Sequence, residues 1–227
     1  MVNSPSPHST QPSALSLIAT LGVVALISGV LVVLVYQLTL PAILENRRIA
    51  LERAIFTVLP GARSRINFAL TAEGLERIDD QQTDGPRVYA GYDLSGKLTG
   101  VALEASAQGY QDIIRILYGY SPKCSCITGI TVLESKETPG LGDKIETDPE
   151  FLVNFEALDG RLNATGERLN NEIVTVKHGK KSNPWEIDAI SGATVSSKAI
   201  GRMLNNSAQK TFPLIMQQLQ KLTQEES

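Results

Sequence analysis

The chain has 227 residues, enough for one membrane-spanning helix followed by one domain of ordinary size. Its 21 basic and 24 acidic residues give a formal net charge of −3, which argues against a nucleic-acid-binding surface because such surfaces are strongly basic. Aromatic residues make up 5% of the chain and there are 2 histidines, so neither a base-stacking platform nor histidine-based metal or triad chemistry is expected. Any redox chemistry would therefore come from a bound cofactor.

The N-terminal region has the composition of a membrane anchor. Residues 14–40 carry no charge, and Leu15 to Tyr36 is a nearly unbroken apolar run of 22 residues. About 20 helical residues cross a hydrocarbon core, so residues 14–40 are predicted to form a transmembrane helix. A cleaved signal peptide is disfavoured because residues 1–13, expected to be a flexible tail, contain no Lys or Arg, and residues 37–41 form a poor cleavage site.

A stalk helix is predicted over residues 41–61, ending at Leu59-Pro60-Gly61. Its apolar residues recur at spacings of seven, four and three, which places them on one helical face: Leu44, Leu51, Ile55 and Val58.

The charges that flank the span bear on its orientation. Arg47, Arg48 and Arg53 follow it closely and nothing basic precedes it. The positive-inside rule alone would put the following domain in the cytoplasm, but that rule weakens for long domains.

The rest of the chain is predicted to be one α+β domain, residues 62–205, followed by a C-terminal helix and tail, residues 206–227. Strands are expected at 88–93, 97–104, 113–118, 127–133 and 173–176, and helices at 148–158 and from 196 onward. A short helix stays open as an alternative at 113–118, and Pro213 is expected to kink or break the last helix. Strands in a row followed by helices favour an antiparallel sheet with flanking helices over a doubly wound fold.

The two cysteines, Cys124 and Cys126, are separated by one residue. In an extended strand both side chains would face the same side, with the sulfurs too far apart for a relaxed disulfide. This spacing predicts two small, partly buried thiols, while a redox pair or half of a shared metal site stays open as an alternative.

One candidate functional motif is Ser191-Gly192-Ala193-Thr194, which lies just before the last predicted helix. The small residues allow close approach to the backbone, and the free N–H groups of the helix start, from about Val195 to Ser197, suit a phosphate. A covalent bond from the Thr194 hydroxyl to that phosphate would hold a ligand at one end. An ordinary helix cap is the alternative.

A second candidate motif runs from Glu137 to Lys144. Pro139 and two glycines predict a tight loop that a flat ligand can approach closely. Thr138 adds a hydroxyl and Lys144 a cation. An ordinary β-turn is the alternative.

With its N-terminal span and these two motifs, the chain resembles the G subunit of the Rnf ion-translocating electron-transport complex. The nearest cousin is the C subunit of the sodium-pumping NADH:quinone reductase. The short chain and residues 137–146 favour the G type, whereas the Cys-x-Cys departs from the family pattern. The resemblance implies flavin mononucleotide (FMN) bound through a phosphoester to Thr194, and an Asp188 that a flavin transferase recognises. It also implies further cofactor-binding residues in the two motifs: Ser191, Gly192, Ala193, Glu137, Thr138, Gly140, Leu141 and Gly142.

The same resemblance implies a function. The chain would be a single-pass protein of the bacterial inner membrane, with its flavin domain on the periplasmic side. It would pass electrons between partner subunits of a complex that couples electron flow to ion movement, with no catalytic residues of its own and no activity alone. Other partners would be the flavin transferase and membrane lipid. A flavin-based redox sensor, a C-type subunit and a structural tether without flavin stay open as alternatives.

Overall fold

The computed structural model describes residues 13–71, 74–79 and 86–224. The chain divides after Ile49 into two compact units. Helix α1, Ala14–Val58, runs through this division and through Pro41 without interruption, so the predicted span and stalk are parts of one continuous helix. It is the one helix of the described residues that is long and apolar enough to cross a membrane, with a mean hydropathy of 2.8 over 18 residues, none of them buried.

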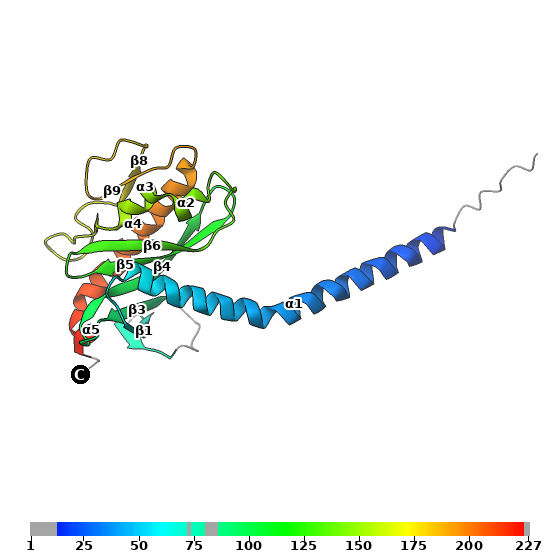
Figure 1. The fold of residues 1–227 in the computed structure, drawn as a ribbon, viewed down its shortest axis with the longest axis horizontal. Helices are drawn as coiled ribbons and strands as arrows, with labels where there is room; N and C mark the ends of the chain where they lie inside the picture. The colour runs from blue at the N-terminus through cyan, green and yellow to red at the C-terminus, as the bar shows by residue number, and fades with distance from the viewer. Residues whose placement is uncertain (1–12, 72–73, 80–85, 225–227) are drawn as a thin grey trace, which may run out of the picture. The chain divides into compact units, whose positions relative to one another are not determined.

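The second unit is built on a seven-stranded sheet with the strand order β2-β1-β3-β4-β5-β6-β7 (Figure 1). Every neighbouring pair in this sheet is antiparallel. The strands are β1 Ser64–Thr71, β2 Gly74–Arg77, β3 Arg87–Tyr92, β4 Leu98–Gln108, β5 Ile113–Ser121, β6 Cys126–Glu134 and β7 Leu158–Asp159. The predicted α+β architecture is confirmed, and residues 113–118 are strand rather than helix.

The remaining elements follow β6 in the chain, and most of them gather on one side of the sheet (Figure 1). They are α2 Lys144–Thr147, α3 Pro149–Leu152, a 3₁₀ turn Val153–Phe155, the parallel pair β8 Val174–Val176 and β9 Glu186–Asp188, α4 Thr194–Gln217 and α5 Leu219–Gln224.

The sheet buries both of its faces, which the two-residue period of its strands makes possible. On β4 and β5, one set of alternating residues packs with α4 in the main core, including Val101, Leu103 and Tyr118. The opposite set, which includes Ala102 and Leu117, packs against residues 54–62. The end of α1 therefore belongs to the core of the domain.

A glycine on β5 sets how closely the end of α1 can approach the sheet. A Cβ on Gly119 would collide with the carbonyl oxygen of Val58 and lie 2.6 Å from Thr128 Oγ1. That same Thr128 hydroxyl donates a 2.6 Å hydrogen bond to the Val58 carbonyl, which satisfies an acceptor at the helix end.

Gly119→Ala is therefore expected to lower the free energy of unfolding by about 2–3 kcal/mol, the usual cost of forcing an extra carbon into a packed interface. Gly129→Ala is the matched control, because a Cβ there meets its nearest atom, Val58 Cα, at 3.5 Å. Chemical denaturation of the two variants measures the difference; equal stabilities would contradict this packing.

Three predicted helix features differ from the structure. The helix expected over 148–158 stops at Phe155, because Leu158 pairs with Ile127 as part of β7. The last helix begins at Thr194 instead of Ser196 and continues through Pro213. The hydrogen bond that Pro213 cannot donate costs stability, but the burial of this proline with its neighbours Phe212 and Ile215 offsets that cost.

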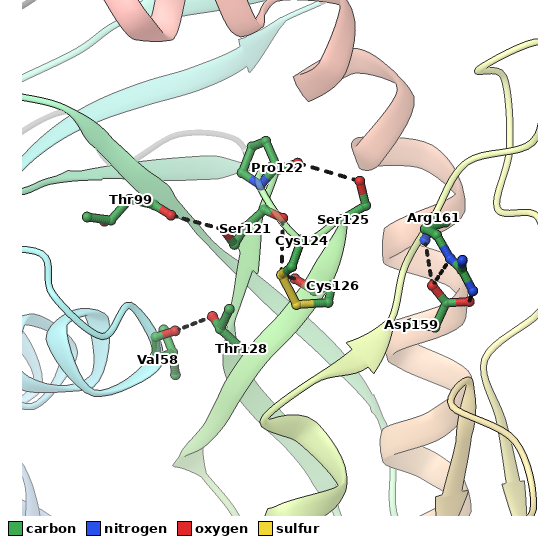
Figure 2. Close-up of a disulfide and its surroundings, with 10 residues drawn as sticks. All are labelled: Val58, Thr99, Ser121, Pro122, Cys124, Ser125, Cys126, Thr128, Asp159 and Arg161. Carbon is green, nitrogen blue, oxygen red and sulfur yellow. Dashed lines mark hydrogen bonds and ion pairs between the residues drawn. A yellow bond between two sulfur atoms is a disulfide. The ribbon is translucent and has the colours of Figure 1, made fainter.

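The prediction of two separate thiols was wrong, because Cys124 and Cys126 form a disulfide (Figure 2). Cys124 lies in the turn before β6 and not in an extended strand. Ser125 has a φ of 52°, so the chain reverses locally and brings the two Cα atoms to 5.2 Å, within the usual disulfide range of roughly 4.4–6.8 Å. Joined in this way, the two sulfurs are not the thiolates that the metal-site alternative needs.

Candidate functional site

A cavity of about 370 Å³ lies where three segments distant in the sequence meet. These segments are the turn between β4 and β5, the loop that follows β6, and the start of α4. The lining residues are Tyr110, Glu137, Thr138, Leu141, Gly142, Gly192, Ala193, Thr194, Val195 and Ser196. The cavity therefore joins the two motifs that the sequence singled out, and its volume lies in the range of small-molecule sites, roughly 300–1,000 Å³.

Thr194 is the first residue of α4, and the cap position before it is held by Ala193. No side chain caps this end of the helix, so the ordinary helix-cap explanation for Thr194 does not apply. The first N–H groups of any α-helix have no partner within the helix. Those of α4 are therefore available to a ligand in the cavity, where the helix dipole favours negative charge.

The hydroxyl groups near this helix start differ in what they bind. Ser196 donates to a carboxylate oxygen of Glu137. The Ser197 hydroxyl donates to the Ala193 carbonyl and accepts from the Ile190 amide at 3.1 Å. Thr194 is partly exposed, and within the described part of the chain its hydroxyl has no hydrogen-bond partner. The Thr194 hydroxyl is thus free to bond to a ligand in the cavity.

Two glycines shape the backbone of the motifs. Gly192 has a φ of 86° and Gly140 a φ of 77°, values that favour glycine because other residues pay a steric penalty there. The turn at Gly192 leads directly into Ala193 and Thr194. A Cβ on Gly192 would lie 4.0 Å from Leu141 Cδ2, so the two motifs meet at this point.

Glu137 connects the three segments that form the cavity through hydrogen bonds. It is 5% exposed; one carboxylate oxygen accepts the Gln111 amide at 3.0 Å, and the other accepts the Ser196 hydroxyl. A Cβ on Gly142 would lie 2.8 Å from this carboxylate, so glycine is needed there. Burial raises the pKa of Glu137, but the hydrogen bonds from Ser196 and from backbone amides outweigh it and hold the pKa below its ordinary value of 4.5.

This lowered pKa predicts a pH dependence. A carboxylate whose pKa is depressed by folding contributes stability that is fully present above its unfolded pKa and is lost as pH falls through the folded value. The difference in unfolding free energy between the unmodified protein and Glu137→Gln should therefore be constant from pH 7 to about 5 and shrink below about pH 4.5. Denaturation curves at a series of pH values measure it; a difference that grows on acidification would contradict the assigned sign.

A second cavity of about 250 Å³ adjoins the same motif and contains Asp188, Ser191, His178 and Lys144 among its lining residues. One Asp188 oxygen accepts the Gly179 amide at 2.9 Å. The other is buried and has no hydrogen-bond partner within the described residues. Asp188 and Ser191 therefore line a cavity that Thr194 does not line, and so does Lys144, which belongs to the Glu137–Lys144 motif.

The structure thus places seven of the predicted cofactor-binding residues around the larger cavity: Thr194, Gly192, Ala193, Glu137, Thr138, Leu141 and Gly142. Ser191 and Gly140 are not among its lining residues. Val195 and Ser196, which the sequence named only for the free N–H groups of the helix start, also line this cavity. Sequence reasoning missed Tyr110, because nothing in the sequence connects it with either motif.

Comparisons with known proteins agree with this site. A family model described as an FMN-binding domain matches residues 109–209, a range that contains every residue lining the larger cavity. The G subunit of the ion-translocating oxidoreductase complex of Pseudomonas aeruginosa (strain UCBPP-PA14) is 32% identical over 207 residues, which cover 87% of this chain and 88% of that relative. This chain belongs to the family of these G subunits.

Other relatives extend the comparison. The G subunit of the corresponding complex of Methanosarcina acetivorans is 35% identical over 57% of this chain and 61% of its own length. Among solved structures, NqrC of Shewanella oneidensis has a similar fold, with a TM-score of 0.61 at 20% identity over 81% of this chain and 100% of that one. The resemblance to the G-type family and to its C-type cousin is confirmed at the level of family and fold.

Proposed function

We propose that this G-type chain carries FMN, joined through a phosphoester to Thr194 Oγ1, and passes electrons between partner subunits of an ion-translocating oxidoreductase complex. The observation that carries the proposal is the position of Thr194. Its uncommitted hydroxyl lies on the wall of a ligand-sized cavity at an uncapped helix start, and the matching family model is that of an FMN-binding domain.

The residues around the cavity fit such a cofactor. Thr194 would provide the attachment atom, and the N–H groups that follow it would face the phosphate. Leu141, Val195 and Tyr110 are 52%, 48% and 72% exposed and would offer apolar surface to a flavin ring. Glu137 would hold the walls in place through its two hydrogen bonds. Bound FMN accepts electrons singly or in pairs, and the protein supplies its position and electrostatic environment.

Maturation would need a flavin transferase, and Asp188 is suited to its recognition. Asp188 lines the second cavity, which Ser191 also lines and Thr194 does not, so an enzyme could contact it without blocking the acceptor hydroxyl. The Asp188 amide donates a 3.0 Å hydrogen bond to Asn154, which fixes the strand end that leads into the motif.

The chain would be anchored in the bacterial inner membrane and its lipid by α1, with the FMN domain on the periplasmic side. The Cys124–Cys126 disulfide supports this side, since disulfides persist in oxidising compartments. The arginines that follow the span favour the opposite side, but charge bias is weak for long domains.

The orientation can be tested with Leu94→Cys in a variant that lacks Cys124 and Cys126, because Leu94 is 90% exposed. The new cysteine should react with a membrane-impermeant maleimide in cells whose outer membrane has been made permeable and whose inner membrane is intact. Labelling that requires a broken inner membrane would overturn the orientation.

The test of function is purification from native membranes. Tagged protein should co-purify with other subunits of a membrane complex, and its flavin absorbance should bleach and recover as the complex turns over. A protein that is isolated alone, or whose flavin does not change redox state during turnover, would contradict an electron-transfer role and favour a sensor.

A further inference from the structure

The Cys124–Cys126 bond connects no separated parts of the fold. Its ring encloses a single residue, Ser125. The hairpin that contains it is already closed by strand pairing, with Ser121 opposite Cys126 and Tyr120 opposite Ile127. Because the stabilisation from a disulfide grows with the length of chain that it closes, this bond adds little to the stability of the domain.

The ring also holds a residue in an unfavourable backbone conformation. Ser125 is the one non-glycine residue of the described chain with a positive φ, a region where a side chain costs free energy. Its carbonyl accepts the Gly160 amide at 3.0 Å, which keeps this side of the ring fixed against the segment after β7. Strained or exposed disulfides are the ones that thiols reduce most readily.

The two sulfurs differ in access. Cys124 is exposed in the turn next to the exposed Lys123. Cys126 is 8% exposed and begins β6, where it pairs with Asp159 of β7. Figure 2 shows the bond at the turn, with Asp159 at the end of the neighbouring strand β7 and Arg161 in the segment after it. An incoming thiolate would therefore reach the sulfur of Cys124, and the Lys123 charge favours its approach.

We propose that Cys124–Cys126 is a thiol–disulfide exchange site whose substrate is a dithiol, either a small molecule or a protein. A thiolate of the substrate attacks Cys124 Sγ, a mixed disulfide forms, and the Cys124–Cys126 bond breaks. Its electron pair goes to Cys126, which takes a proton from solvent. The second substrate thiolate then attacks the substrate sulfur of the mixed disulfide, and Cys124 leaves with the electron pair of that bond and takes a proton from solvent. The substrate is oxidised to a disulfide and the protein is reduced to two thiols.

This site is separate from the flavin cavity. Tyr110 of the flavin cavity precedes strand β5, and the disulfide follows it. The strand has 9 residues with a rise of about 3.3 Å each, so its two ends lie about 30 Å apart. Exchange at Cys124 therefore does not depend on the proposed flavin chemistry.

The first test is reduction of the native full-length protein in detergent. Dithiothreitol, a small dithiol, should open the disulfide without denaturant, as shown by a gel shift after alkylation with a polymer-linked maleimide. Circular dichroism and the unfolding midpoint should remain close to those of the oxidised protein. A disulfide that opens only after denaturant is added, or a domain that unfolds on reduction, would overturn the proposal.

A matched pair of variants tests which sulfur is attacked. In Cys126→Ser the remaining Cys124 should form a mixed disulfide with oxidised glutathione at least about tenfold faster than the remaining Cys126 in Cys124→Ser, because Cys126 is buried. Equal rates would contradict attack at Cys124. Both variants should bind as much flavin as the parent protein, so that a failure here is distinct from a failure of the proposed FMN site.

Discussion

Thr194→Val is expected to abolish covalent flavin completely while the domain stays folded. Valine has nearly the same shape as threonine but no hydroxyl, so no phosphoester can form. Thr194 is partly exposed at the start of α4, and the change in unfolding free energy should stay within about 1 kcal/mol. Expression in a host that contains a flavin transferase, followed by ultraviolet illumination of a denaturing gel, measures the loss directly.

Two control variants make this result specific to Thr194. Thr194→Ser keeps a hydroxyl at the same backbone position and should retain at least part of the fluorescence. Ser191→Ala should retain all of it, because Ser191 lines the second cavity and not the one that contains Thr194. Fluorescence that survives in Thr194→Val would show that another residue carries the flavin.

Glu137→Ala is expected to have the largest effect on stability. The variant leaves the Gln111 amide and the Ser196 hydroxyl without their acceptor, at a position where the parent side chain is 5% exposed. A buried group without a partner costs about 1–3 kcal/mol, so the two together should lower the unfolding free energy by about 3–4 kcal/mol. Flavin content should fall as well, since the three cavity segments are no longer joined. Denaturation curves and flavin-to-protein ratios give both quantities.

Glu156→Ala is the matched control, because Glu156 is exposed and lies outside the cavity lining. Its substitution should change stability by no more than about 0.5 kcal/mol and leave flavin content unchanged. If Glu137→Ala matched this control in both measurements, the carboxylate would not be the link between the cavity segments.

Much of the fold could be predicted from the sequence, because its central strands are short runs bounded by turn residues. The runs 88–93 and 97–104 flank Leu94-Ser95-Gly96, and they pair as the antiparallel strands β3 and β4. The strands β1 and β2 were missed, although Ile66, Phe68 and Leu70 of β1 recur at a period of two and this alternation is typical of a strand. The disulfide was missed because the spacing of Cys124 and Cys126 was judged for an extended strand, whereas the positive φ of Ser125 is a property of the folded turn.

The candidate site could be predicted in part, for a physical reason. Thr194 and Glu137 belong to short motifs whose local composition indicates a helix start and a tight loop. What the sequence could not provide was the contact between them: the Glu137 carboxylate reaches Ser196 across 59 positions. Tyr110 joins the same cavity from a turn between two strands. That position depends on sheet register, which no local pattern specifies.

The central claim, FMN on Thr194, is tested most directly by mass spectrometry of the protein from its native membrane. Trypsin should release residues 182–198, between Lys181 and Lys198, as one peptide that contains Thr194. We expect this peptide to carry the added mass of an FMN phosphoester, with fragment ions that assign the modification to Thr194 and not to Ser191, Ser196 or Ser197. An unmodified peptide as the main product, or fragment ions that place FMN on another residue, would contradict the claim.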